Sequence, residues 1–288
     1  MPFAIDQNIC VSCGSCIVIC PNRAIVRRGA EVIITDMCCD CGTCIRYCAV
    51  KAISPGAEKA DFDNAGIDKA LKKKLGLTRD IVAMKYADKA PEGFTPEEGV
   101  NFWCHICGDI FDKTGGPVFF AGENSICGGG AALGLGARMV SREDVMMVMD
   151  AVSGMGGYFA THDLFTKARA DFPKFSQIYK GLLIASLAQL AMPDVILLPV
   201  NAHQMCMLST AYSFETGEVI QGTAGGGTCL GTVVQPFLEN KPVFTCGDHG
   251  GRMHMRLRDD ENLVCFPFRL VPGLLKNMDR TIYATDMA

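Results

Sequence analysis

Eight of the sixteen cysteines fall in two runs near the beginning of the chain. Both runs read C-x2-C-x2-C-x3-C, with proline after the first and alanine after the second. Thiolates this close together on a tight loop hold three corners of an iron–sulfur cubane, and the fourth cysteine of each run reaches the other cluster. The spacing therefore predicts two [4Fe-4S] clusters. Cys10, Cys13, Cys16 and Cys48 would hold the first, and Cys38, Cys41, Cys44 and Cys20 the second.

The two runs belong to an internal duplication, because the residues around the cysteines also match. C-V-S-C-G-S-C-I-V-I-C-P-N-R-A-I aligns without a gap on C-C-D-C-G-T-C-I-R-Y-C-A-V-K-A-I. The intervening A-I-V-R-R-G-A-E-V-I-I predicts a β-hairpin that turns near Gly29. Cys39 breaks the spacing, so we expect no ligand role for it. Zinc or unmetallated thiols are the alternative to iron.

Residues 1–57 resemble the bacterial two-cluster ferredoxins in both motifs and in their order. The resemblance implies transfer of low-potential electrons, one at a time, with an electron donor or acceptor protein as partner. A carrier alone would not need the much longer remainder of the chain, so a second task is expected there. Sixteen cysteines with metal-type spacing also favour a reducing or anaerobic cytoplasm over a secreted disulfide scaffold.

Composition narrows the classes of partner. A formal net charge of −4 gives no sign of nucleic-acid binding. The most apolar stretch, 181–200, is interrupted by Gln189, Pro193 and Asp194, whereas a membrane-spanning helix needs roughly 20 predominantly apolar residues. We interpret this stretch as a buried helix followed by a buried strand. The first residues also lack an apolar signal segment, so a cytoplasmic protein without a membrane span is expected.

The remainder of the chain mixes helix and strand patterns. The polar segment 54–63 carries proline and glycine and is expected to separate two domains, 1–57 and 64–288. The predicted fold class is α+β, with a small ferredoxin-like domain followed by a larger mixed α/β domain. Helices are expected at 65–77, 141–152, 201–214 and 271–278, and strands at 81–86, 117–122, 194–200, 241–246 and 252–258.

Further cysteines lie in the larger domain, several beside glycine or in expected loops. Two triple-glycine segments, 127–134 and 224–231, each carry a cysteine and would allow close backbone approach to a ligand. A third iron–sulfur cluster or other metal centre is one hypothesis; a Cys104–Cys107 dithiol and purely structural thiols are the others. Cys206 and Cys265 fit structural roles in a helix and a strand. The candidate ligands of a third centre are Cys104, Cys107, Cys127, Cys229 and Cys246.

A basic, histidine-containing segment follows Cys246. R-M-H-M-R-L-R (252–258) alternates polar and apolar residues, which predicts a strand with Arg252, His254, Arg256 and Arg258 on one face. This face could bind an anionic small-molecule substrate, and His249 or His254 could supply a proton. The alternative is a solvated strand whose arginines pair with the acidic residues 259–261.

Residues 80–288 resemble a prokaryotic family known as domain of unknown function 169. The resemblance rests on E-N-S-I-C-G-G-G-A-A-L-G-L, P-D-V-I-L-L-P-V-N-A-H-Q-M, G-G-G-T-C, T-C-G-D-H-G-G-R and D-D-E-N-L-V-C-F-P-F. Members carry cysteines that match Cys107, Cys127, Cys229 and Cys246, although the tract after Cys246 departs from the usual shorter spacing to arginine. The family name implies no activity.

Three functions are consistent with these patterns. The first is a ferredoxin-fused oxidoreductase that passes electrons from the two clusters to a substrate or third cofactor in the larger domain. The second is a non-catalytic electron-transfer or redox-sensing subunit that docks a partner enzyme. The third is a protein that handles a cofactor or metal for another protein.

Overall fold

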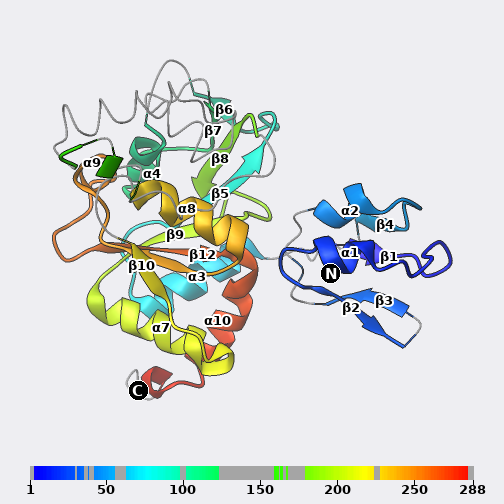
Figure 1. Ribbon diagram of the computed structural model, residues 1–288. Coiled ribbons are helices and arrows are strands. Elements are labelled where there is room, and N and C mark those ends of the chain that lie inside the picture. Colours follow the sequence, from blue (N-terminus) through cyan, green and yellow to red (C-terminus); the bar gives the residue numbers. More distant parts are fainter. Residues whose placement is uncertain are drawn as a thin grey trace. The chain divides into compact units, whose positions relative to one another are not determined.

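The computed structural model describes residues 3–29, 31–35, 38, 42–55, 63–97, 102–122, 159–161, 163–164, 167, 179–223 and 228–284. The chain divides into two compact units, Met1–Phe62 and Asp63–Ala288 (Figure 1). The helix expected at 141–152 and the glycine segment 127–134 lie outside the described residues.

The described residues of the first unit form two short helices and two pairs of strands. Each helix begins after a glycine in the left-handed region, Gly14 (φ 80°) and Gly42 (φ 66°), where a side chain would be strained. The expected hairpin is confirmed, with Gly29 (φ 63°) in its turn. The elements are β1 (Phe3–Ile5), α1 (Ser15–Ile19), β2 (Ile25–Arg28), β3 (Glu31–Ile34), α2 (Thr43–Tyr47) and β4 (Ile53–Pro55), with β1 paired antiparallel to β4.

The second unit is built around a mixed sheet of eight strands within the described part of the chain. The two outer pairs, β10–β11 and β6–β7, are parallel, and all other neighbours are antiparallel. In sheet order the strands are β10 (Gln221–Thr223), β11 (Val243–Thr245), β12 (Asn262–Pro267), β9 (Val195–Val200), β5 (Val82–Ala87), β8 (Gly181–Ser186), β7 (Val118–Ala121) and β6 (Thr95–Pro96).

Helices cover both faces of this sheet (Figure 1). Leu263 and Cys265 of β12 join the core formed with α4 and α8, whereas Phe266 contacts Tyr212 of α7 on the opposite face. This alternation follows from the two-residue period of a strand. The helices are α3 (Asn64–Leu75), α7 (Ala202–Thr216) and α10 (Val271–Met278) on one side, and α4 (Trp103–Phe111) and α8 (Thr228–Glu239) on the other, with α9 (His249–His254) against α4.

Local capping signals place several of these helices. The Asp63 side chain accepts the Gly66 N–H at the start of α3. Asn201 and Gln204 form a reciprocal capping box at the start of α7, which confirms the expected helix there. The strands expected around residues 81–86, 117–122, 194–200 and 241–246 and the helix at 271–278 are also confirmed.

Two expectations about secondary structure were wrong. Residues 181–186 form the strand β8 and not a helix, because helices on both sides of the sheet allow a strand to be apolar on both faces. Residues 252–258 do not form a strand. Asp248 caps α9 by accepting the Gly251 N–H, and the chain leaves the helix at Arg256, in the left-handed region with φ 51°.

Candidate metal centre

The two cysteine-bearing halves of the first unit fold alike. Arg23 and Lys51 occupy equivalent positions after the fourth cysteine of each run, and both adopt positive φ, 50° and 54°. This turn directs a backbone N–H back to the preceding sulfur. Ala24 N–H donates to Cys20 Sγ at 3.3 Å, and Ala52 N–H donates to Cys48 Sγ at 3.2 Å. The duplication in sequence is therefore a duplication in geometry.

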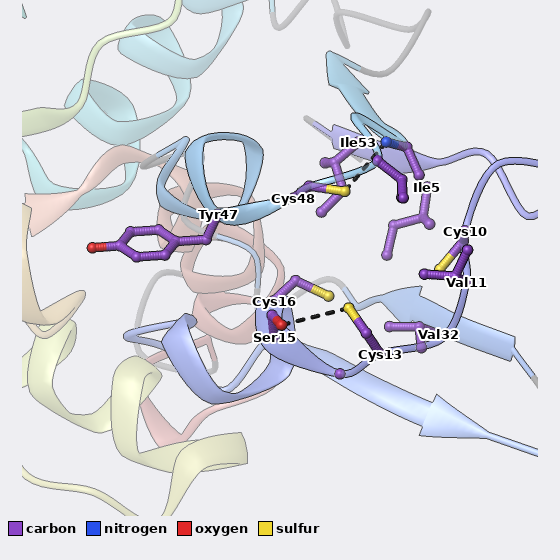
Figure 2. Close-up of a pocket in the computed structure, with 13 residues that line it drawn as sticks. Ile5, Cys10, Val11, Cys13, Ser15, Cys16, Val32, Tyr47, Cys48 and Ile53 are labelled. Atoms are coloured by element: carbon purple, nitrogen blue, oxygen red, sulfur yellow. Dashed lines mark hydrogen bonds between the residues drawn. The ribbon is translucent and has the colours of Figure 1, made fainter.

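Four cysteines from separated parts of the first unit surround one pocket. Figure 2 shows their sulfur atoms facing a common space, with Cys48 contributed by the second half of the duplication. Cys13 is exposed, Cys16 is buried, and Cys10 and Cys48 are half-buried. Apolar side chains complete the lining: Ile5, Val11, Val32, Val50, Ala52 and Ile53, with Tyr47 at the side.

The four cysteines of this pocket can be compared with the ligand sets of a single ion and of a cluster. No group of three or more His, Cys, Asp or Glu side chains among the described residues is arranged to hold one metal ion. A zinc ion holds its thiolates at about 2.3 Å and so draws them close together. A cubane presents its iron atoms at separate corners, so its four ligands stand further apart around a larger volume. The first pocket has four cysteine thiols in its lining, which is the donor type and number that a [4Fe-4S] cluster requires.

The electrostatics of the pocket also favour a bound cation. Burial raises the pKa of the Cys16 thiol, and the neighbouring Cys10 and Cys13 raise it further. Hydrogen bonding to Ser15, whose Oγ lies 3.5 Å from Cys13 Sγ, lowers the pKa of the Cys13 thiol, with a smaller contribution from Arg27. Thiolates collected in one place repel one another, and a cationic metal cluster would relieve that repulsion.

The second predicted ligand set is described in part. Cys44 is buried, Cys20 and Cys38 are half-buried, and Cys41 lies outside the described residues, as does Cys39. Cys16 and Cys44 are both in the small core that holds the two helices together. The core also contains Phe3, Ile25, Val32, Ile34 and Ile53.

The cysteines of the second unit lie in a different environment. Cys104 and Cys107 are on α4 rather than in a loop, and both are buried in the core between α4 and the sheet. Burial raises the pKa of the Cys107 thiol strongly, and Cys104 and Cys265 add to the effect. Cys265 is fully buried on β12, as expected for a structural thiol. These thiols have the burial of core residues and would be poor thiolate donors.

The other second-unit cysteines do not complete a third ligand set in the described structure. Cys246 is exposed after β11. Cys229 is in the first turn of α8, its side chain outside the description, and Cys127 lies outside the described residues altogether. Cys206 is exposed on α7, so its expected place in the core was wrong.

Histidines of α4 and α9 approach one another. The His254 ring stacks on Phe102, with their centroids 4.5 Å apart, and lies 6.2 Å from the exposed His105 ring. Burial lowers the pKa of His254, and the nearby His105 lowers it further, against a weaker opposing effect of Asp248. His254 is therefore mainly neutral at neutral pH. His249 is exposed at the start of α9.

The arginines expected to meet an anion have partners within the protein. The Arg252 guanidinium donates to three backbone carbonyls, at 2.7–2.9 Å, which belong to Cys246, Arg258 and Glu261. Arg256 forms ion pairs with two carboxylates of the α4 region, Asp109 and Asp112. Both side chains thus fix the path of the chain after α9, and an anion would have to compete with these contacts.

Sequence reasoning missed a buried ion pair next to this region. Arg79 donates to Glu261 at 2.7 Å and to Asp112 at 2.8 Å, and it also donates to the carbonyls of Met255 and Arg256. The side chains of Arg79 and Glu261 are 5% and 9% exposed. The partners are 182 residues apart, so no local pattern could have paired them.

Comparison with known families identifies both units. A family described as the 4Fe-4S binding domain matches residues 3–26, so the first unit is an iron–sulfur domain of the ferredoxin type. The family DUF169, described as uncharacterised ArCR, matches residues 70–277. The chain belongs to this DUF169 family and carries a ferredoxin-type domain fused before the DUF169 domain. No curated protein and no solved structure matches the chain. No helix among the described residues is long and apolar enough to cross a membrane.

Proposed function

We propose that this protein is a ferredoxin-fused iron–sulfur oxidoreductase. Low-potential electrons enter through two [4Fe-4S] clusters and pass to a substrate or further cofactor in the DUF169 unit. The observation that carries the proposal is the pocket in which Cys10, Cys13, Cys16 and Cys48 turn their sulfurs to one space.

Each half of the duplication contributes to both proposed sites. Cys48 belongs to the second half but completes the first ligand set, and Cys20 belongs to the first half but completes the second ligand set. The matching N–H bonds from Ala52 and Ala24 hold these two crossing sulfurs in place. When bound, the clusters supply one-electron transfer. The chain keeps their sulfurs at fixed positions, which limits reorganisation as the electron moves.

The larger unit would supply binding and proton transfer. His254, whose pKa is lowered by burial, can take up a proton and release it readily, and the exposed His105 lies beside it. An anionic substrate fits the basic segment after Cys246, provided that it displaces internal partners of Arg252 or Arg256. A further metal centre would need Cys127 or Cys229 in addition to the cysteines described.

Iron analysis of cysteine variants tests the two-cluster proposal. Anaerobically purified protein should contain about eight irons and eight labile sulfides per chain. Cys16→Ala and Cys44→Ala should each lose about half of the iron, with different changes in the electron paramagnetic resonance (EPR) spectrum. Cys206→Ala, an exposed thiol on α7, is the matched control and should lose none. Zinc in place of iron, or equal losses in all three variants, would refute the proposal.

A non-catalytic electron-transfer or redox-sensing subunit is the second candidate. It is favoured by the internal pairing of Arg252 and Arg256, which leaves the described basic segment engaged with its own chain. In that case reduced protein should transfer electrons only to a partner protein. In the oxidoreductase, small anionic acceptors should oxidise it directly. A third possibility, handling a cofactor or metal for another protein, predicts transfer of that group instead of net electron transfer.

A further inference from the structure

The two halves of the ferredoxin-type unit differ in one charged position near the first pocket. Alignment of the duplication places Arg27 of β2 opposite Pro55 of β4. Arg27 Nη2 donates to the Ser12 carbonyl at 2.6 Å. The same nitrogen lies 3.7 Å from the position that a Cβ on Gly14 would occupy. The guanidinium therefore lies against the loop that carries Cys10, Cys13 and Cys16.

Two other features are matched between the described parts of the halves. The N–H···S bonds at Cys20 and Cys48 have nearly equal lengths, 3.3 and 3.2 Å. Gly14 and Gly42 start equivalent helices in the same backbone conformation. These features act on both sites in the same direction, whereas Arg27 has no basic counterpart in the second half. Arg46 of the second half, which aligns with Val18, is exposed on α2 between Cys44 and Cys48, which belong to different sites, so its charge favours neither. The sequence adds to the difference in charge between the halves, because the neutral Ser12 of the first run aligns with the acidic Asp40 of the second.

We propose that Arg27 raises the reduction potential of the site formed by Cys10, Cys13, Cys16 and Cys48 above that of the second site. This inference rests on the proposed function. A cluster held by four thiolates is an anion, and reduction adds one more negative charge, which a nearby cation stabilises. With both clusters bound, this difference would favour the electron at the first site: the second cluster would be oxidised by one electron and the first reduced by one. No proton or bond change is required.

The apolar lining of the first pocket acts in the opposite direction but is open to water. An apolar environment disfavours added charge and so lowers a reduction potential. Val11 and Tyr47, which line the pocket in Figure 2, are 64% and 57% exposed, and Cys13 is exposed as well. Solvent therefore weakens this lowering, and the Arg27 charge determines the order of the two potentials.

The test is an anaerobic redox titration of the full chain, followed by EPR. Cys13→Ser and Cys41→Ser assign the two signals, because each changes a ligand of one cluster. The signal altered by Cys13→Ser should have the higher midpoint potential. Arg27→Gln should then lower that midpoint potential by about 28 to 59 mV, which for one electron corresponds to a threefold to tenfold change in the oxidised-to-reduced ratio. Arg27→Lys, which keeps the charge, should retain most of the difference.

Arg28→Gln is the matched control, since it removes the same charge from the next residue of β2, whose side chain points to the other face of the hairpin. It should move the midpoint much less than Arg27→Gln does. The inference is overturned if the higher potential belongs to the signal altered by Cys41→Ser, or if Arg27→Gln and Arg28→Gln have equal effects. If Arg27→Gln loses the first cluster, the order of the two midpoint potentials in the unsubstituted protein decides the question. Absence of two clusters would instead refute the proposed function.

Discussion

Replacement of Arg79 by methionine should destabilise the DUF169 unit strongly. The guanidinium is buried between α4 and the segment after α9, where it joins Glu261, Asp112 and two backbone carbonyls. Methionine fills part of the same volume but removes the charge and every donor. Glu261, only 9% exposed, would then be a buried carboxylate without its closest cationic partner.

The size of the effect follows from burial. Breaking a buried ion pair by removing one partner costs about 3–5 kcal/mol. Glu261 keeps the N–H of Arg258, at 2.9 Å, and Asp112 is exposed enough to be solvated, so the lower end, about 3 kcal/mol, applies. At a urea dependence of about 3 kcal/mol per M, the unfolding midpoint should fall by about 1 M.

Trp103 provides the assay because it is the single tryptophan of the chain and is buried in α4, the helix that ends at this network. Its fluorescence, followed anaerobically in increasing urea, reports unfolding of the second unit. Arg280→Met is the control, since Arg280 forms an exposed ion pair with Glu215, and it should cost less than about 1 kcal/mol. Equal midpoints for the two variants would show that the Arg79 pair does not hold α4 to the segment after α9.

Two other predictions concern the same region, and both use Trp103 fluorescence in urea. Gly108→Ala should lower the stability by about 1–3 kcal/mol, because a Cβ there would lie 2.5 Å from the His254 carbonyl oxygen. Gly116→Ala, with no atom within 4 Å of its Cβ, is the control and should cost far less. Equal costs would contradict the close approach of α4 and α9. Burial alone would raise the pKa of Asp112, but Arg256 and Arg79 outweigh this effect and lower the pKa. The stability that this carboxylate contributes is therefore present above its unfolded pKa, near 3.8, and is lost as the pH falls through the lower pKa of the folded protein. Asp112→Asn should therefore flatten the loss of stability below about pH 4, and an unchanged acid profile would contradict the pairing.

The parts of the fold that sequence predicts well are those set by neighbouring residues. The cysteine spacing, the hairpin turn at Gly29 and the Asn201 cap of α7 each depend on contacts within a few positions. The resemblance to the ferredoxins and to DUF169 is confirmed for the same reason, because it rests on local motifs.

The expectations that failed depended on contacts between distant segments. The alternation in 252–258 indicated a strand, but these residues form the end of α9 and a turn in which Arg256 pairs with the distant Asp109 and Asp112. Residues 181–186 became a strand because the sheet has a helical layer on each side, which a single segment cannot reveal. Cys104 and Cys107 were candidate ligands of a third centre, yet packing of α4 on the sheet buries them. The Arg79–Glu261 pair joins two segments without any shared motif.

The most direct test of the central claim is an anaerobic crystal structure of the full chain with anomalous scattering measured at the iron edge. The account predicts two compact iron clusters of four atoms each in the first unit. One should be bound by Cys10, Cys13, Cys16 and Cys48, and the other by Cys20, Cys38, Cys41 and Cys44. A single metal ion in the first pocket, or clusters whose fourth ligand comes from the same cysteine run, would contradict it.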